Sequence, residues 1–307
     1  MNLLLVIEQG LNGLQLGVML FLMAAGLTLV FGIMNLVNLA HGSLYMVGAY
    51  LATTFYQWTG SFPAAVVLAL AGTLVVGVAV ELVALRTLYE RDHLDQVLAT
   101  FGLILFFNEL VAVVWGRAAL YASLPASLSG HVQLLPGIRY PVYRASVIGV
   151  GLVVALLLWL VVSRTRLGML IRAGASNRTM VAALGVNIRL LYTVVFGCGA
   201  ALAGLAGLMA GPIYVVQPGM GEQILIQVFV VIVIGGIGSI RGALVGAIIV
   251  GMVDTLGRAF LKPMLATVVT PTAADAAGPA LASMLIYILM ASVLAFRPQG
   301  LFPSRGR

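Results

Sequence analysis

Long apolar runs constrain this 307-residue chain more than any other feature. A helix needs about 20 apolar residues to cross the hydrocarbon core of a bilayer. Hydrophobic residues make up 62% of the chain and charged residues only 8%, so it carries more apolar surface than a soluble domain can bury. The runs also lack the alternation of membrane-barrel strands. We therefore expect an all-α, polytopic membrane protein. Runs that meet the required length or come close to it are 13–31, 63–80, 96–115, 145–163, 190–211 and 276–296.

Shorter apolar pieces raise the expected number of membrane spans to nine, within a range of eight to ten, in a single transmembrane domain over residues 1–307. The segments are 10–31, 41–58, 63–85, 96–115, 145–163, 190–212, 223–239, 242–258 and 278–296.

Basic residues predict the orientation, because cytoplasmic loops are enriched in Lys and Arg. The loop 163–189 holds five arginines and no acidic residue, and the tail 297–307 adds three arginines. We place both in the cytoplasm. Alternation then puts the N-terminus and the loops 116–144 and 259–277 outside. The same effect explains the net charge of +7 without nucleic-acid binding. The start of the chain has no basic residue and carries Glu8, so we expect no cleaved signal peptide.

Two polar, glycine-rich stretches interrupt the apolar pattern. The first is GIMNLVNLAHGSLYMVGAY, residues 32–50, and the second is GGIGSIRG within 223–257. Interrupted segments in two halves of a transporter are a sequence pointer to its translocation path. His41-Gly42 and Arg241-Gly242 are 200 residues apart in similar surroundings, and a duplicated core and a chance similarity both remain open. The glycines expected at the breaks are Gly32, Gly42, Gly235, Gly236, Gly238 and Gly242.

Small residues recur at every fourth position in three expected helices. Such stripes let helix backbones approach closely. We expect packing within the chain rather than an oligomer interface. The stripes are Gly199, Ala203, Gly207 and Gly211, then Gly13 and Gly17, and finally Gly242 and Gly246.

The sequence shows no recognisable catalytic, cofactor or metal site. The one lysine, Lys262, does not follow a glycine-rich phosphate loop. The histidines His41, His93 and His131 are far apart and belong to no metal-binding motif. Cys198 is the only cysteine, so no disulfide can form within the chain. We expect no metal, no cofactor and no enzymatic activity.

Charged residues inside the expected spans are the remaining candidates, because each is costly in a membrane. Asp254 and Arg258 have the spacing of an ion pair on one helix. Glu81 lies one turn from the cytoplasmic end of its span, where it can reach water or Arg86, and we expect it to be structural. Asn108 and Glu109 lie deeper, where a cavity-facing role and a helix-packing hydrogen bond are both open.

Three stretches together resemble the permease subunits of branched-chain amino acid ABC transporters. They are GLTLVFGIMNLVNLAHGSLYMVGAY (26–50), RLGMLIRAGASNRTMVAALGVN (166–187) and VVIVIGGIGSIRGALVGAIIVG (230–251), with FRPQGLF near the end. The likeness runs along nearly the whole chain and is greatest to the H-type permease. It implies a heterodimer with an M-type permease in the bacterial inner membrane, two cytoplasmic ABC ATPase subunits and an extracytoplasmic substrate-binding protein.

The resemblance assigns the loop 163–189 as the element that docks on an ATPase. Its apolar residues and glycines predict a short helix–turn–helix, whereas a passive basic anchor would explain only the arginines. The residues to which the resemblance carries a coupling role are Arg172, Ala173, Asn177, Met180, Ala183, Leu184, Gly185 and Asn187.

Polar residues of the first break are the candidate lining of the substrate path. The alternative is structural, with Asn38 as an N-cap and the side chains satisfying the backbone at the break. The candidates are Asn35, Asn38, His41 and Tyr45, together with Asn108 and Glu109.

The function expected is import of branched-chain amino acids. Within the same family, a permease for urea or short amides is the nearest alternative. From another class, a secondary transporter or channel would need an internal ion-coupling site, and few buried acids are present to form one. A membrane-embedded enzyme would need clustered catalytic groups, which the sequence lacks.

Overall fold

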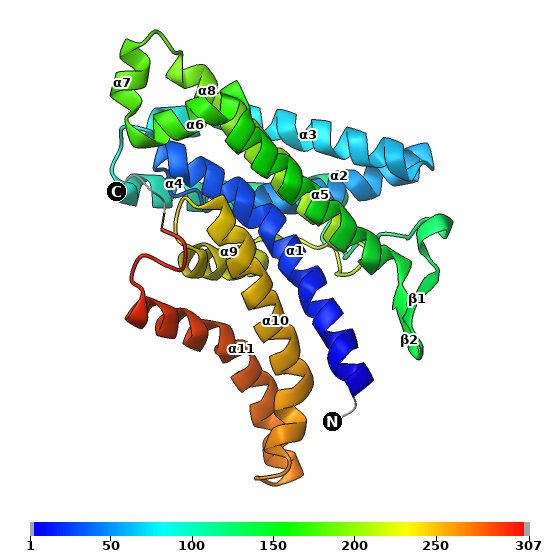
Figure 1. Cartoon of the computed structure of the whole chain (residues 1–307). Helices are drawn as coiled ribbons and strands as arrows, with labels where there is room; N and C mark the ends of the chain where they lie inside the picture. Colours follow the sequence, from blue (N-terminus) through cyan, green and yellow to red (C-terminus); the bar gives the residue numbers. More distant parts are fainter. Residues whose placement is uncertain (1–2, 304–307) are drawn as a thin grey trace.

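The computed structural model describes residues 3–303, and almost all of its regular structure is helical (Figure 1). The long helices are α1 (Leu3–Met34), α2 (His41–Thr59), α3 (Phe62–Val83), α4 (His93–Trp115), α5 (Val142–Arg164), α8 (Ile188–Ala210), α9 (Met220–Gly235), α10 (Ile240–Leu265) and α11 (Pro271–Phe296). The short elements are α6 (Arg166–Ser176), α7 (Arg178–Ala183), the 3₁₀ turns Leu85–Leu88 and Ala126–Leu128, and the strands β1 (His131–Leu135) and β2 (Ile138–Pro141). Residues 304–307, which include two of the tail arginines, lie outside the described chain.

Helix α1 is the centre of the bundle and packs against α8 and α10. It runs antiparallel to α10, since Gly13 faces Met252 while Gly17 faces Ala247. A Cβ on Gly17 would come within 2.9 Å of the Ala247 carbonyl oxygen. A Cβ on Gly26 would come within 2.7 Å of the Gly199 carbonyl oxygen on α8. The predicted use of the small-residue stripes for packing within the chain is therefore confirmed at these crossings.

The outer helices α3, α4, α5 and α11 present apolar side chains at the surface. Examples are Val75 on α3, Leu98 on α4 and Val153 on α5, which are all exposed. Apolar side chains on an exposed surface of this kind suit contact with lipid. The first ten residues of α2, by contrast, are all buried. The bundle thus keeps the polar, glycine-rich first half of α2 away from lipid.

The expected count of nine spans is not confirmed. Within the described chain, seven helices are long and apolar enough to cross a membrane: α1, α3, α4, α5, α8, α10 and α11. Helix α9 is apolar but only 16 residues long. Helix α2 has 19 residues and falls outside the set of seven.

Two expected loops contain regular structure. Much of the expected loop 259–277 is helical, because α10 continues to Leu265 and α11 starts at Pro271. Proline suits the first turn of a helix, where its missing N–H leaves no hydrogen bond unmade. Lys262 and Asp275 form an exposed ion pair at 2.8 Å between these two helix ends. In the loop 116–144, β1 and β2 pair antiparallel, with Val132 opposite Tyr140.

Glu81 is structural, as the sequence predicts, although its side chain does not reach water. Its side chain is fully buried at the end of α3. Its carboxylate accepts hydrogen bonds from the Tyr89 hydroxyl at 2.5 Å and from the Thr193 hydroxyl at 2.8 Å. The carboxylate therefore joins α3 to α8 and to the connection that follows α3, which is a structural role.

Two buried tyrosines near the start of α5 differ in hydrogen bonding. The Tyr143 hydroxyl donates to the Met209 carbonyl oxygen at 2.9 Å. The Tyr140 hydroxyl is buried and has no hydrogen-bond partner among residues 3–303. Burial raises the pKa of Tyr140 to about 12, while the nearby Arg144 guanidinium lowers it and the Glu8 carboxylate raises it.

We expect the two hydroxyls to contribute differently to stability. Tyr143→Phe leaves the Met209 carbonyl without its donor and should cost about 1 kcal/mol of unfolding free energy. Tyr140→Phe removes a buried hydroxyl that makes no bond, so it should leave stability unchanged or raise it. Melting temperatures in one detergent measure the difference, and equal losses in both variants would contradict it.

Candidate substrate path and coupling surface

A polar cavity of about 790 Å³ opens at the end of the bundle opposite to α6 and α7. Its walls come from the N-terminal half of α1, the first turn of α5, residues 213–217, α9 and the C-terminal half of α10. Figure 1 shows α1 and α10 diverging toward this end. The apolar lining residues are Leu16, Ile213, Val215, Met220, Ile224 and Ala259.

Side-chain amides make up much of the cavity wall. Gln9, Asn12 and Gln15 lie at intervals of three on α1, and Gln223 and Gln227 lie four apart on α9. Residues three and four apart share one face of a helix. Each amide offers both donors and an acceptor, so the wall suits a small polar solute.

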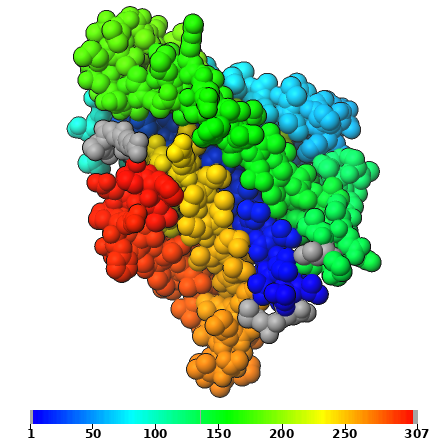
Figure 2. All heavy atoms as spheres, viewed as in Figure 1, coloured from blue at the N-terminus to red at the C-terminus, as the bar shows by residue number. Residues whose placement is uncertain are grey.

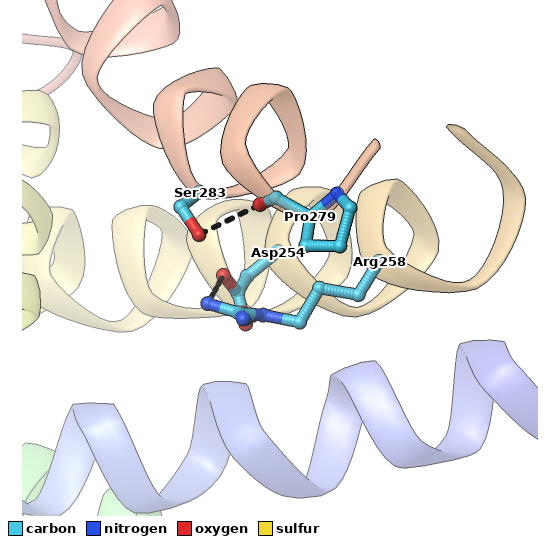
Figure 3. Close-up of polar contacts among 4 residues, drawn as sticks. All are labelled: Asp254, Arg258, Pro279 and Ser283. Carbon is cyan, nitrogen blue, oxygen red and sulfur yellow. Dashed lines mark hydrogen bonds and ion pairs between the residues drawn. The ribbon is translucent and has the colours of Figure 1, made fainter. Parts of the chain in front are cut away.

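One ion pair of α10 faces this cavity. Arg258 donates from Nε and Nη2 to the two carboxylate oxygens of Asp254, each at 2.9 Å. The predicted pairing is therefore confirmed. Figure 3 shows both side chains on the face of α10 turned toward α1, while Ser283 and Pro279 belong to α11, on the side of α10 away from α1. The Asp254 side chain is 6% exposed and that of Arg258 is 52% exposed.

A third charge, Arg144, enters the cavity from α5. Its Nη1 donates to the Asn12 side-chain oxygen at 2.6 Å. Within residues 3–303, it forms no ion pair. Tyr214 lies in the same field: burial and the Asp254 carboxylate raise the pKa of its phenol, while Arg144 and Arg258 lower it. The net direction is upward, so Tyr214 stays a neutral hydrogen-bonding group at pH 7.

Tyr45 is the one sequence-predicted path residue that lines the cavity. One turn before it on α2, His41 is fully buried, and Asn38 is 1% exposed. Neither side-chain atom of Asn38 has a hydrogen-bond partner in the described chain. The ring nitrogens of His41 also make no hydrogen bond of good geometry there, although the Met23 backbone is close. The alternative in which Asn38 caps α2 is wrong, because Ala40 precedes the helix and no side chain caps it.

The other predicted path residues lie outside the cavity lining. Asn35 ends α1 with a positive φ of 51°, and its side chain is exposed. Asn108 donates to the Glu222 carboxylate at 2.5 Å and accepts from the Gly219 N–H at 3.2 Å, so it fixes the start of α9 against α4. Glu109 forms an exposed ion pair with Arg117 at 3.0 Å.

Glycines lie where the interrupted helices meet. A Cβ on Gly42 would be 2.9 Å from the Gly221 carbonyl carbon, so α2 and α9 cross in backbone contact. Gly235 and Gly242 make the same kind of contact between α9 and α10. Between those helices, Gly236 and Gly238 have φ values of 104° and 83°, which favour glycine. The last of the predicted glycines, Gly32, lies opposite Gly238, with its Cβ position 3.6 Å from the Gly238 Cα.

The predicted helix–turn–helix in the loop 163–189 is confirmed as α6 and α7. Figure 2 shows it as a lobe at one end of the molecule. Asn177 and Asn187 cap α7 and α8 through bonds of 2.9 and 3.1 Å to the Met180 and Leu190 N–H groups. Gly185 makes the turn with φ of 87°. The remaining residues carried over from the resemblance are exposed or partly exposed: Arg172, Ala173, Met180, Ala183 and Leu184.

Apolar residues at this lobe have no cover in the described chain. Met180 is 59% exposed and Leu184 is 77% exposed. Exposed apolar side chains beside arginines are typical of a protein-interaction surface. The lobe thus has the composition expected of a docking surface.

The spacing of amide side chains in the sequence points to the cavity, whereas the charged residues and the helix breaks do not. The amides at positions 9, 12 and 15 share a helix face, as do those at 223 and 227. A stripe of amides on one face of an apolar helix predicts a polar wall, and no such stripe was among the expected path residues. Among residues 3–303, no group of three or more metal-ligating His, Cys, Asp or Glu side chains occurs.

Comparison with known proteins agrees with this architecture. Residues 10–294 match the family model described as branched-chain amino acid transport system / permease component. The high-affinity branched-chain amino acid transport system permease protein BraD of Pseudomonas aeruginosa is 31% identical, over 96% of this chain and 95% of its own. LivH of Escherichia coli, a permease protein of the same description, is 29% identical over 83% and 87%. The ribose import permease protein RbsC of Escherichia coli is 26% identical over 76% and 72%.

No solved structure matches the chain. The family model covers nearly all of the helical bundle, from α1 to α11, and BraD aligns over almost the full length of both chains. This chain therefore belongs to the family of branched-chain amino acid transport system permease components.

Proposed function

We propose that the chain is the permease subunit of an ATP-driven importer of branched-chain amino acids. The observation that carries the proposal is the polar cavity, which opens at one end of an otherwise apolar bundle and reaches Tyr45 in the glycine-rich break. The substrate class comes from BraD and LivH, which are permease proteins of branched-chain amino acid transport systems. RbsC, a ribose permease, shows that relatives differ in cargo, so sugars belong in the test along with urea and short amides.

The route continues from the cavity through His41 and Asn38. Both residues follow Tyr45 toward the opposite end of the bundle and are buried in this conformation. Buried polar groups without partners destabilise a fold, by about 1–3 kcal/mol for each group. Such groups are reasonable where another conformation exposes them to a polar solute. The proposal rests on Asn38, His41 and Tyr45, and not on Asn35, Asn108 or Glu109.

The energy source lies on other subunits in this proposal. The chain itself hydrolyses no ATP, and the lobe of α6 and α7 docks on a cytoplasmic ABC ATPase. A second, M-type permease completes the membrane part, two ATPase subunits drive it, and an extracytoplasmic binding protein delivers substrate. The N-terminus and the cavity then face outward, and the C-terminus and the lobe face the cytoplasm of a bacterial cell.

Cysteine accessibility tests the orientation. With Cys198 replaced by serine, Ala175→Cys on α6 should react in intact cells only with a thiol reagent that crosses the membrane. Ser127→Cys, before the hairpin, should react with an impermeant reagent. Both positions are in exposed segments. The reverse pattern would place the lobe outside and overturn the assignment.

Asn38→Leu tests the route. Leucine has a similar size but no polar atoms, so the variant should keep or raise the melting temperature. Uptake of radiolabelled leucine by proteoliposomes that contain all subunits should fall about tenfold or more. The reason is that the solute loses roughly one hydrogen bond as it passes the position of the removed polar group. A lower melting temperature together with lower uptake would show that Asn38 has a structural role.

Gly185→Val tests coupling. At a φ of 87°, a β-branched residue is strained, so the turn after α7 must change its path. We expect weaker ATPase docking or ATP hydrolysis that no longer follows substrate, while the chain still inserts. Gly185→Asn is the matched control, since asparagine tolerates positive φ better. Unchanged docking and coupled transport in Gly185→Val would remove this turn from the coupling surface.

The same assay separates the functional alternatives. Leucine uptake without ATP or ATPase subunits would support a secondary transporter or channel instead. Uptake of urea, an amide or ribose in preference to leucine would change the substrate class but keep the importer.

A further inference from the structure

We propose that the polar cavity is itself a recognition site for the charged backbone of an α-amino acid, with Arg144 as the carboxylate-binding residue. This inference rests on the proposed function. It assigns the permease a part in selection, so that specificity is not set by the binding protein alone.

The first support is the charge balance of the cavity. Its lining holds two guanidinium groups, Arg144 and Arg258, and one carboxylate, Asp254. Arg258 is already paired with Asp254 through two bonds of 2.9 Å. Arg144 is left with the neutral amide of Asn12 at 2.6 Å. The cavity therefore carries one positive charge without a counter-charge on its wall.

The geometry of that charge favours a carboxylate. A guanidinium offers five N–H donors in a planar fork, which matches the two oxygens of a carboxylate. The bond to Asn12 uses one donor of Arg144 and holds the side chain against α1. Among residues 3–303 the remaining donors make no side-chain hydrogen bond, so they can bind an anion, and a charge in a partly dehydrated wall gains most from an opposite charge.

The ammonium group of the same solute would meet acceptors elsewhere on the wall. A carboxylate has about four lone-pair positions, and Arg258 occupies two of those on Asp254. The amide oxygens of Gln9 and Gln223 are further acceptors on the adjoining helices. Tyr214 lies within the field of Arg144, Asp254 and Arg258, so the charged parts of the wall are close to one another.

The apolar part of the wall suits an aliphatic side chain. Leu16, Ile213, Met220 and Ile224 line the cavity beside these polar groups. A solute with a carboxylate, an ammonium group and a branched aliphatic chain has a partner for each part. The cavity is wide and open, so binding should be weak, as a site on a transport route requires. Urea and sugars can accept a hydrogen bond from Arg144 but have no carboxylate to balance its charge.

Direct binding to the permease–ATPase complex without the binding protein is the first test. Radiolabelled leucine should bind, and unlabelled leucine should compete at least about tenfold better than leucinamide, which lacks the carboxylate. Arg144→Gln should weaken leucine binding by about tenfold or more and bring the leucine to leucinamide ratio close to one. Arg144→Lys keeps the charge without the fork and should give an intermediate loss.

Matched controls separate recognition from folding. Arg139→Gln, on the exposed side of β2, should leave both binding and the ratio unchanged. Melting temperatures show which variants are folded. If Arg144→Gln is unstable, the leucine to leucinamide ratio measured in Arg144→Lys supplies the test instead. An unchanged ratio in a folded Arg144 variant would overturn the proposal. That result is also expected if the guanidinium binds a lipid phosphate instead.

Uptake by the complete transporter tells the two proposals apart. If the wild-type complex imports ribose or urea but not leucine, the proposed function fails. If it imports leucine, and folded Arg144→Gln does so with unchanged affinity and unchanged ratio, only the recognition site fails.

Discussion

Close approach of glycine-bearing backbones is the interaction on which the rest of this structure depends. Helix association within a bilayer has no hydrophobic driving force between helices, so packing at small residues takes its place. Gly13, Gly17 and Gly251 seat α10 on α1, and Gly26 faces Gly199 on α8. The contacts on α10 end near Gly13, and beyond them α1 and α10 diverge (Figure 1). Longer side chains such as Gln9 and Arg258 fill that region and line the cavity.

The residues of the first break show how burial and function oppose each other. Asn38 and His41 of the break, and Thr28 of α1, are buried polar side chains without hydrogen bonds of good geometry in residues 3–303. Real proteins violate the rule of polar satisfaction chiefly at functional sites. In the proposed route, His41 lies one turn from Tyr45 of the cavity wall, and a polar solute that passes there would give these groups a partner. A purely structural break would have used its side chains to cap the free backbone, and Asn38 does not do so.

Local rules predicted much of the fold and the short-range contacts, but not the contacts between distant segments. The spacing of Asp254 and Arg258 was enough to predict their pairing, because both lie on one helix. Helix ends were harder: α10 and α11 extend into the expected loop at 259–277 from its two ends, since membrane helices continue past their apolar segments. The bond from Arg144 to Asn12 joins residues 132 apart, and no periodicity links such a pair, because the two meet only after the helices have packed. Arg144 therefore did not stand out in the sequence, whereas His41 stood out by residue type alone.

Helix α1 connects the two ends of the molecule that carry the proposals. Its N-terminal half lines the cavity through Gln9, Asn12 and Gln15. Near its other end, the Ile33 side chain lies 3.7 Å from the position of a Cβ on Gly174 in α6. A 32-residue helix held on two sides by backbone contacts bends little. In the proposed assembly, displacement of α6 by a docked ATPase would therefore act on the same helix that forms part of the cavity wall, without a longer chain of side-chain contacts.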